Sequence, residues 1–297
     1  METILEKNKK SSKKNKKVLD IIFSHAILII LAVIWLIPIV WMILTAFREE
    51  WINGVFQGSV QSNFYPRGFG VENFRRLFSE TYFIKWFFNT LLVAVFTTIL
   101  STIMVVIVSY TVSKLRFRMR KPLMNIAMIL GLFPGFMSII AVYYILKSMG
   151  LTQSLFALIL CYSASSGLGF YIAKGFFDII PTALLESAKI DGASGLQTFL
   201  KVILPLSKPI IIYTVLTSFT GPWMDFIFAR VILGESNSQI HTVSVGLYLM
   251  IHSSQADGTM FSTFIAGCII VSIPIVALFL VMQKYYVEGV TSGAVKG

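Results

Sequence analysis

The residues with the most varied chemistry lie in one polar stretch, residues 186–205, which reads ESAKIDGASGLQTFLKVILP. It brings acids, lysines, small residues and glycines together between two strongly apolar segments. Pro181 suits the first turn of a helix, and Gly192 can end that helix by taking a positive φ. A second helix follows up to Pro205, with apolar residues at i, i+3, i+4 and i+7: Leu196, Phe199, Leu200 and Ile203. The pattern predicts two short amphipathic helices joined at a glycine.

Such a helix pair suits two environments. It can rest on lipid headgroups, as interfacial amphipathic helices do. It can instead dock into a groove on another protein, where a carboxylate fixes the register through a charge-assisted hydrogen bond. An anionic membrane surface favours lysine and arginine, whereas the polar face of this pair also carries acids. The acids favour a protein partner.

The other residues that could perform chemistry form no recognisable catalytic, metal or phosphate-binding site. The sequence has no G-x-x-x-x-G-K-[ST] phosphate-binding loop. Cys161 and Cys268 lack CxxC spacing, and we interpret them as buried small hydrophobic residues. His241 and His252 lack metal-ligand spacing, and we expect both at the surface. Clustered His, Asp or Glu residues, which a membrane-embedded enzyme or an ion-coupled carrier needs, are not apparent. We expect no catalytic residue, metal or cofactor in this chain.

Long apolar segments must position the polar stretch. The 297 residues are 56% hydrophobic and 13% charged, with a mean hydropathy of +0.78. Soluble domains carry about twice that share of charge. Runs of about 20 apolar residues, which cross roughly 30 Å of hydrocarbon as helices, recur along the chain. They predict an all-α polytopic membrane protein with six transmembrane helices, at residues 22–46, 86–110, 122–146, 154–174, 207–233 and 261–283.

Lysine and arginine in short loops set the orientation, because they stay on the cytoplasmic side. Residues 1–17 carry seven lysines and two glutamates, and the loop 114–121 carries five cations and no acid, so both should be cytoplasmic. The loop 234–260 has no Lys or Arg and should be external. We therefore expect a membrane domain over residues 18–289 and a cytoplasmic tail over residues 290–297. The net charge of +11 then reflects topology and not binding to nucleic acid.

The polar stretch resembles the EAA loop of ABC importer permeases, whose pattern is E-A-A, three residues, G, nine residues and I-x-L-P. The matching positions are Glu186, Ala188, Gly192, Val202, Leu204 and Pro205. Ser187 replaces the middle alanine, and Val202 replaces the isoleucine. The segments LFPGFMSIIAVYYIL, FTGPWMDF and QKYYVEGVTSGAVKG extend the resemblance over most of the chain. Together they are similar to the MalG-like, six-helix subunit of oligosaccharide importers.

The resemblance implies roles for particular segments. In such permeases the EAA loop is a coupling helix seated in a cleft of the cytoplasmic ATPase, which here implicates residues 181–205. The coupling residues would be Glu186, Ser187, Ala188, Asp191, Gly192, Ala193, Leu204 and Pro205. The family's tail inserts between the ATPase subunits, which implicates Gly293, Lys296 and Gly297. The external loop would reach the sugar-binding protein with a tip near residues 236–239 or 253–258, because residues 242–251 are apolar enough to lie on the membrane.

The resemblance also implies the protein's partners and location. These are a second homologous permease, a cytoplasmic ATPase dimer that holds ATP and Mg, an extracellular solute-binding protein and the lipid of a bacterial cell membrane. Both termini would be cytoplasmic. The implied cargo is an oligosaccharide of the maltose or maltodextrin type. The alternatives are another sugar or a galacto-oligosaccharide and, less favoured, an ion-coupled secondary carrier.

One acid falls inside a predicted span. Asp225 lies about 17 residues into it, which at about 1.5 Å per residue places it near the outer edge of the bilayer. It could line the outer part of a sugar path, with Trp223 as a stacking surface. It could instead be an interfacial residue satisfied by water, a backbone amide or Arg230. Pro222 is expected to kink this helix, and Asn89 is expected to bond between helices more often than to a substrate.

Overall fold

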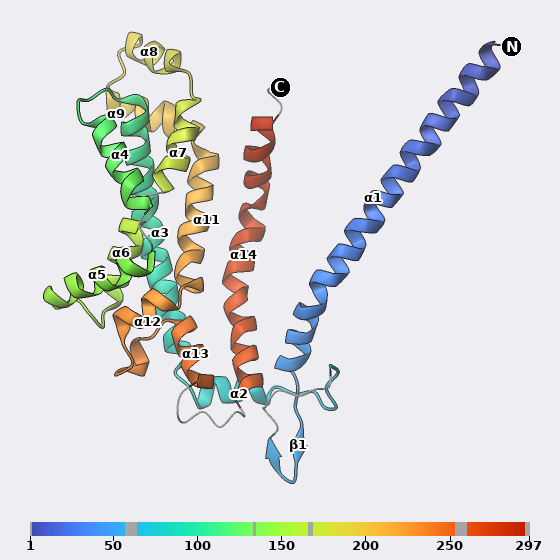
Figure 1. Ribbon diagram of the computed structural model, residues 1–297, viewed down its shortest axis with the longest axis vertical. Helices are drawn as coiled ribbons and strands as arrows, with labels where there is room; N and C mark the ends of the chain where they lie inside the picture. Colours follow the sequence, from blue (N-terminus) through green and yellow to red (C-terminus); the bar gives the residue numbers. More distant parts are fainter. Residues whose placement is uncertain (1, 57–63, 133–134, 166–168, 253–259, 295–297) are drawn as a thin grey trace. The chain divides into compact units, whose positions relative to one another are not determined.

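The structure, a computed structural model, describes residues 2–56, 64–132, 135–165, 169–252 and 260–294. It is almost entirely helical, which confirms the all-α fold class (Figure 1). Among the described residues, a two-stranded hairpin is the one sheet. The chain divides into two compact units, residues 1–75 with 258–269 and residues 76–257 with 270–297.

The first unit contains one long helix and a small hairpin. Its elements are α1 (Glu2–Ala46), β1 (Trp51–Ile52), β2 (Val55–Phe56) and the beginnings of α2 (Glu72–Ser79) and α14 (Phe261–Ala294). β1 and β2 pair antiparallel around Asn53 and Gly54. Both turn residues have positive φ, as the favoured two-residue hairpin turns require.

Buried polar side chains organise the segment that follows α1. The amide of Asn73 donates to the carbonyl oxygens of Ala46 at 3.0 Å and Arg48 at 2.8 Å. The buried guanidinium of Arg48 pairs with Glu50 at 3.0 Å. Part of the mixed charge in this predicted external loop is therefore structural, which gives its cations a role besides setting the orientation.

The second unit is a helical bundle. In chain order its elements are α3 (Phe83–Lys114), α4 (Arg120–Gly131), α5 (Gly135–Ser148), α6 (Leu155–Ser165), α7 (Gly169–Asp178), α8 (Thr182–Ile190), α9 (Gly195–Thr198), the π-helical turn η2 (Phe199–Ile203), α10 (Leu204–Leu206), α11 (Lys208–Met224), α12 (Ile227–Leu233), the 3₁₀ turn η3 (Ser238–Ile240) and α13 (Val243–His252). The later part of α14 belongs to the same unit.

α3 is the central helix of this unit. The helices α6, α7, α11 and α13 pack against it (Figure 1). Small side chains such as Ala94 and Ser101 form much of its buried face, and they let neighbouring helices approach closely. Apolar clusters lie on both sides of its midpoint: Val93 packs with Leu158 and Leu233, and Val105 packs with Phe177 and Ile203.

Among the described residues, four helices are long and apolar enough to cross a membrane: Leu19–Ala46, Phe83–Lys114, Leu155–Asp178 (with residues 166–168 undescribed) and Phe261–Gln283. A fifth results if Gly195–Leu206 and Lys208–Met224, bent by 76°, form one span. The third predicted span, residues 122–146, is divided into α4 and α5, and each of these is too short to cross alone. The number six therefore stays a prediction.

Helices in two predicted segments begin or end at other residues than expected. The fifth predicted span, residues 207–233, is interrupted, because α11 ends at Met224 and α12 begins at Ile227. The break lies at Asp225, whose ψ of 129° is extended, whereas Pro222 lies inside α11. The predicted tail also differs, because α14 continues to Ala294 and residues 290–294 are helical.

Candidate functional site

The polar stretch folds into two short helices joined at a glycine, as predicted, and we call residues 181–205 the knob. Gly192 ends α8 in a Schellman motif with a φ of +80°. Its N–H donates to the Lys189 carbonyl at 3.0 Å, and the Ala193 N–H donates to the Ala188 carbonyl at 2.9 Å. A Cβ at Gly192 would meet nothing within 4 Å, so the chain itself makes no close approach there.

The second helix of the knob begins with a capping box. The Ser194 hydroxyl accepts from the Gln197 N–H at 3.3 Å, and the Gln197 side chain accepts from the Ser194 N–H at 2.9 Å. The helix then widens into the π-helical turn η2, in which the Leu204 N–H bonds to the Phe199 carbonyl. Pro205 follows and has no N–H to donate, so a local departure from α-helical bonding is expected there.

One face of the knob packs on the bundle. Ile203 is fully buried in the cluster that contains Val105 and Phe177. The ring of Phe199 lies 4.7 Å from that of Tyr110 on α3. Because these side chains are packed among α3, α7 and α11, the knob is part of the bundle and not a loose loop.

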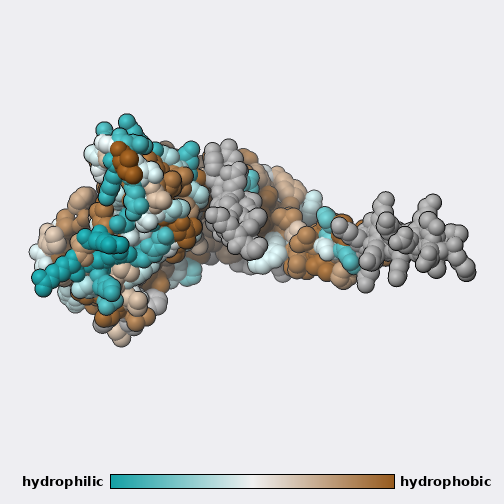
Figure 2. Space-filling model, turned by 90° about the horizontal axis from the view of Figure 1, so that it is seen from above, coloured by the Kyte–Doolittle hydropathy of each residue, from teal (hydrophilic) through white to brown (hydrophobic). Residues whose placement is uncertain are grey.

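The opposite face of the knob is open. Ile190 is 86% exposed and Leu196 is 67% exposed. Glu186 and Asp191 are exposed as well, and no described residue pairs with either carboxylate. Viewed from the end that carries α8, hydrophilic and hydrophobic residues are mixed on the surface of this unit (Figure 2). Exposed apolar groups beside unpaired acids make a surface suited to a partner protein.

The predicted coupling residues divide between these two faces. Exposed ones are Glu186, Ser187, Asp191, Gly192 and Pro205, whereas Ala188 is buried and Ala193 and Leu204 are half-buried. Leu204 packs on the apolar cluster below the knob, so direct contact with a partner is left to the exposed residues. Of the predicted tail residues, Gly293 lies in the last turn of α14, and Lys296 and Gly297 lie outside the described residues.

Hydrogen bonds of Asp178 and Lys114, which the sequence analysis did not predict, link the end of α7 to the end of α3 just before the knob. We call them the polar joint. Asp178, the last residue of α7, accepts from the Ser113 hydroxyl at 2.6 Å and from the Lys174 ammonium at 2.5 Å. The Lys114 ammonium donates to the Ile180 carbonyl at 2.6 Å. Ser113 and Lys114 end α3, so both helices terminate at one hydrogen-bonded point.

Asp225 is satisfied within the chain. Its carboxylate accepts from the Ala229 N–H at 2.9 Å, which caps α12, and from the Tyr162 hydroxyl at 2.5 Å. Of the predicted partners, the backbone amide is therefore observed. Arg230 instead pairs with Glu235.

Trp223 does not offer the predicted stacking surface. Its side chain is 3% exposed and packs against the rings of Phe87, at 5.2 Å, and Phe219, at 6.0 Å. The prediction assumed that the residues near Asp225 line a path for the sugar, whereas the Trp223 side chain faces α3.

The predicted external loop packs on α3, whereas residues 242–251 were expected to lie on the membrane. Val243 and Val245 of α13 are fully buried. Gly246 lies so close to α3 that a Cβ there would come within 2.2 Å of the Trp86 ring. The contact is possible because glycine has no side chain.

The predicted free tip at residues 236–239 is tied to α3, and the alternative tip at residues 253–258 lies outside the described residues. The Trp86 indole donates to the Ser238 carbonyl at 2.6 Å. The Asn89 amide donates to the carbonyl oxygens of Gln239 at 2.9 Å and His241 at 3.0 Å. Asn89 thus bonds between elements of the chain, in line with the favoured interpretation.

The prediction that His241 lies at the surface is wrong. The residue is 1% exposed, and its Nε2–H donates to the Gly234 carbonyl at 3.0 Å. Its Nδ1 has no partner among the described residues. Burial lowers the pKa of His241 and outweighs the opposing effects of the Gly234 carbonyl and the Glu235 carboxylate. His252 is exposed, as predicted.

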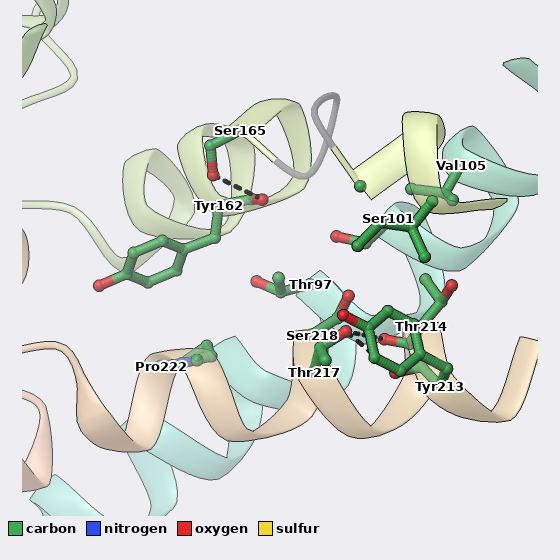
Figure 3. A pocket seen from close by; sticks show the side chains of 13 residues that line it. Thr97, Ser101, Val105, Tyr162, Ser165, Tyr213, Thr214, Thr217, Ser218 and Pro222 are labelled. Carbon is green, nitrogen blue, oxygen red and sulfur yellow. Dashed lines mark hydrogen bonds between the residues drawn. The ribbon is translucent and has the colours of Figure 1, made fainter. Parts of the chain in front are cut away.

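A cavity of about 300 Å³ lies between α3, α6, α7 and α11, and hydroxyl groups line it (Figure 3). They include Thr97 and Ser101 from α3, Tyr162 and Ser165 from α6, and Tyr213 and Thr217 from α11. Sequence reasoning missed this site, because Ser and Thr in transmembrane helices usually bond between helices or to their own backbone. A signal was present in the closely spaced hydroxyls Tyr213, Thr214, Thr217 and Ser218 on α11.

Apolar helices long enough to cross a bilayer, a polar cavity among them and an exposed knob define an integral membrane protein of the transport class. Residues 107–292 match the family described as binding-protein-dependent transport system inner membrane component. The match covers more than half of the chain and includes the knob. The chain therefore belongs to this family.

Relatives of similar length have been characterised. The chain is 31% identical to the galactooligosaccharides transport system permease protein GanQ of Bacillus subtilis, over 96% of this chain and 98% of that one. It is 30% identical to the maltodextrin transport system permease protein MalD of Streptococcus pneumoniae, over 97% and 99%. A crystal structure of a bacterial ABC transporter involved in the import of the acidic polysaccharide alginate contains a chain with the same fold, with a TM-score of 0.76, 22% identity and coverage of 89% and 95%.

Proposed function

We propose that the chain is a permease subunit of an ATP-binding-cassette importer and that its cargo is an oligosaccharide. Relatives that match over nearly the whole chain are named as permeases for galactooligosaccharides and maltodextrin, which supports this class of cargo. The sequence motifs favour a maltose or maltodextrin type. The likeness to a galactooligosaccharide permease makes that sugar the second candidate.

The proposed importer has four kinds of component. An extracellular solute-binding protein delivers the sugar, and this chain conducts it across the bacterial cell membrane together with a second, homologous permease. A cytoplasmic ATPase dimer holds ATP and Mg, since the sequence has no phosphate-binding loop. The family description, a binding-protein-dependent system, supports the delivery step.

The knob is the observation that carries this proposal. Its open face presents Glu186 and Asp191 beside the exposed side chains of Ile190 and Leu196. A groove on the ATPase would take the apolar side chains, and a basic residue there would bind Glu186 through a charge-assisted hydrogen bond. Since the other face of the knob packs on α3, displacement of the knob would move α3 as well.

Substitutions in the knob test this coupling. Glu186→Ala removes a charged hydrogen bond and should lower the affinity for the ATPase about tenfold or more. Combined with Gly192→Asp, which places a side chain at a φ of +80°, it should abolish sugar uptake while the protein stays in the membrane. The measurements are uptake by membrane vesicles and the amount of ATPase that copurifies with the permease.

Asp20→Ala is the matched control, because Asp20 is an exposed acid of α1 outside the knob. It should leave uptake and copurification unchanged. Normal uptake and normal ATPase recovery in the Glu186→Ala, Gly192→Asp double variant would refute the coupling role of the knob.

A further inference from the structure

The second unit carries a strongly basic loop at the end where the knob lies. Residues Lys114–Lys121, which we call the basic loop, read KLRFRMRK and contain five cations and no acid. The Lys114 ammonium donates to the carbonyl of Ile180, the residue before the knob, at 2.6 Å. The Tyr171 hydroxyl of α7 donates to the Met124 carbonyl of α4. Hydrogen bonds on both sides therefore hold the basic loop on the bundle.

The basic loop is too short to extend far from the membrane surface. It connects α3, which ends at Lys114 and is long and apolar enough to cross a membrane, to α4, which begins at Arg120. The chain between these two residues spans about 20 Å when fully extended, so a loop that leaves and returns reaches at most about 10 Å. The headgroup layer of a bilayer is roughly 5–8 Å thick. Where α3 crosses a bilayer, the basic loop therefore lies at the level of the lipid headgroups.

The cations of the basic loop are available to an anionic partner. Arg116, Arg118 and Lys121 are exposed. None of these three side chains forms an ion pair or a hydrogen bond with a residue that the structure describes. Asp178, the acid that ends α7, already pairs with Lys174. Because like charges in one short loop repel each other, an anionic partner would stabilise them.

Apolar side chains alternate with these cations. Leu115, Phe117 and Met119 are between 38% and 51% exposed. Leu115 has an extended backbone, with a φ of −91° and a ψ of 142°, and neighbouring side chains of an extended chain point to opposite sides. At the border of a bilayer, apolar side chains can enter the hydrocarbon while the long side chains of arginine and lysine reach the headgroups.

We propose that the basic loop is a binding site for the headgroups of anionic phospholipids. Arg116, Arg118 and Lys121 bind the phosphates, and the apolar side chains between them enter the acyl-chain layer. Arginine suits this role, because its planar guanidinium can bond two phosphate oxygens at once. The inference goes beyond the proposed function, since it concerns the surrounding lipid and neither the cargo nor the ATPase.

A lipid is favoured over an acidic protein because of the depth and the composition of the basic loop. An anionic membrane surface attracts lysine and arginine close to the end of a transmembrane helix, which is where these cations lie. The open face of the knob, in contrast, presents the acids Glu186 and Asp191. The two neighbouring surfaces therefore suit different partners.

The test measures the lipids that the purified importer complex retains in native mass spectrometry. After exchange into equal amounts of phosphatidylglycerol and phosphatidylcholine, the wild type should retain at least about fivefold more of the anionic lipid. Arg116→Gln with Arg118→Gln removes two charges and should lower retention of phosphatidylglycerol about tenfold, with phosphatidylcholine unchanged. The melting temperature in phosphatidylcholine should equal that of the wild type, since neither side chain has a partner among the described residues.

Lys201→Gln with Lys208→Gln is the matched control. It removes the same amount of charge from exposed residues near the knob, outside the basic loop. Retention of phosphatidylglycerol should stay within about twofold of the wild type. Equal losses in the two double variants would show that the net charge of this end attracts the lipid, and they would overturn the assignment to the basic loop.

A second measurement locates the lipid. In a background with Cys161→Ala and Cys268→Ala, Phe117→Cys carries a bimane label in proteoliposomes, and lipids with brominated acyl chains quench its fluorescence. Brominated phosphatidylglycerol should quench it at least about twofold more than brominated phosphatidylcholine at the same mole fraction. A label on Ser236→Cys, in the loop without Lys or Arg, should show no such preference. Equal quenching of the Phe117→Cys label by both lipids would contradict the proposal.

The remaining outcomes assign the basic loop to another partner. Normal retention of phosphatidylglycerol in the Arg116→Gln, Arg118→Gln variant, with loss of the ATPase from the purified complex, would assign the loop to the ATPase and overturn the proposal. Displacement of the lipid by inorganic phosphate, but not by sodium chloride of the same ionic strength, would identify free phosphate as the ligand instead. A preference for anionic lipid in a complex that transports no sugar would support this inference and contradict the proposed function alone.

Discussion

The buried ring of His241 predicts that the loop 234–260 loses stability in acid. Its Nε2–H bonds to the Gly234 carbonyl, and its pKa is lowered mainly by burial. The unfolded loop has the ordinary histidine pKa of about 6.5, which is higher. As the pH falls below about 6.5, the unfolded form takes up the proton first, so stability is lost until the folded pKa is reached.

We therefore expect residues 234–248 to exchange amide hydrogens faster at pH 5 than at pH 7, after correction for intrinsic rates. His241→Gln can still donate to the Gly234 carbonyl and should abolish this difference. His252→Gln changes an exposed residue and should preserve it. An equal effect of acid on the wild type and on His241→Gln would show that another group is responsible.

The roles of residues that bond to near neighbours in sequence could be predicted, whereas the burial of residues with distant partners could not. Gly192 ends α8 through bonds to residues within five positions, which the sequence contains. His241 and Trp223 contact residues far away in sequence, Asn89 and Phe87, and no local pattern encodes their burial. The role of Glu186 stays a prediction from its motif, because its proposed partner is another protein.

The packing of α13 on α3 depends on the missing side chain of Gly246. A methyl group there would overlap the Trp86 ring, and the ring cannot simply move, because its indole nitrogen bonds to the Ser238 carbonyl. Overpacking of this kind costs about 1–3 kcal/mol. Gly246→Ala should therefore lower the melting temperature of the purified protein and increase hydrogen exchange in α13.

Gly175→Ala provides the comparison for this helix contact. Gly175 lies in α7, where an added Cβ meets nothing within 4 Å, and alanine is the better helix former. This variant should melt at or above the wild-type temperature. If Gly246→Ala melts as the wild type does, the close contact between α13 and Trp86 is not maintained in the protein.

At the level of elements, apolar length predicted where most helices lie but not where they break. The end of α11 depends on Asp225, whose partner Tyr162 comes from another helix. The hairpin of β1 and β2 was predictable and was missed, since Asn53-Gly54 is a strong two-residue turn signal. The π-helical turn before Pro205 was overlooked too, although a proline interrupts the regular ladder there.

The orientation that the loops predict for the whole molecule can be tested directly. Ser236 lies in the loop without Lys or Arg, and Arg118 lies in the loop with five cations; both are exposed. With Cys161 and Cys268 replaced by alanine, Ser236→Cys should react with an impermeant maleimide on intact cells. Arg118→Cys should react only after permeabilisation. The reverse pattern would contradict the predicted topology.

For the molecule as a whole, composition defined a membrane protein and one motif defined its family, but neither pointed to the cavity. Thr97, Tyr162 and Thr217 are widely separated in sequence, and only the packing of α3, α6 and α11 brings them together. Each hydroxyl alone is ordinary in a transmembrane helix. Only the tertiary structure places these hydroxyl groups around one cavity.

The polar joint at Asp178 and the cavity share one helix. Ser113, which bonds Asp178, lies only about 18 Å along α3 from Ser101. Because one packed helix carries both places, a movement of α3 at Asp178 would also displace the lining of the cavity, and any linkage that results would be reciprocal. If the importer works as proposed, any effect of the docked ATPase on the binding of an occupant in the cavity would be matched by an equal effect of that occupant on the binding of the ATPase.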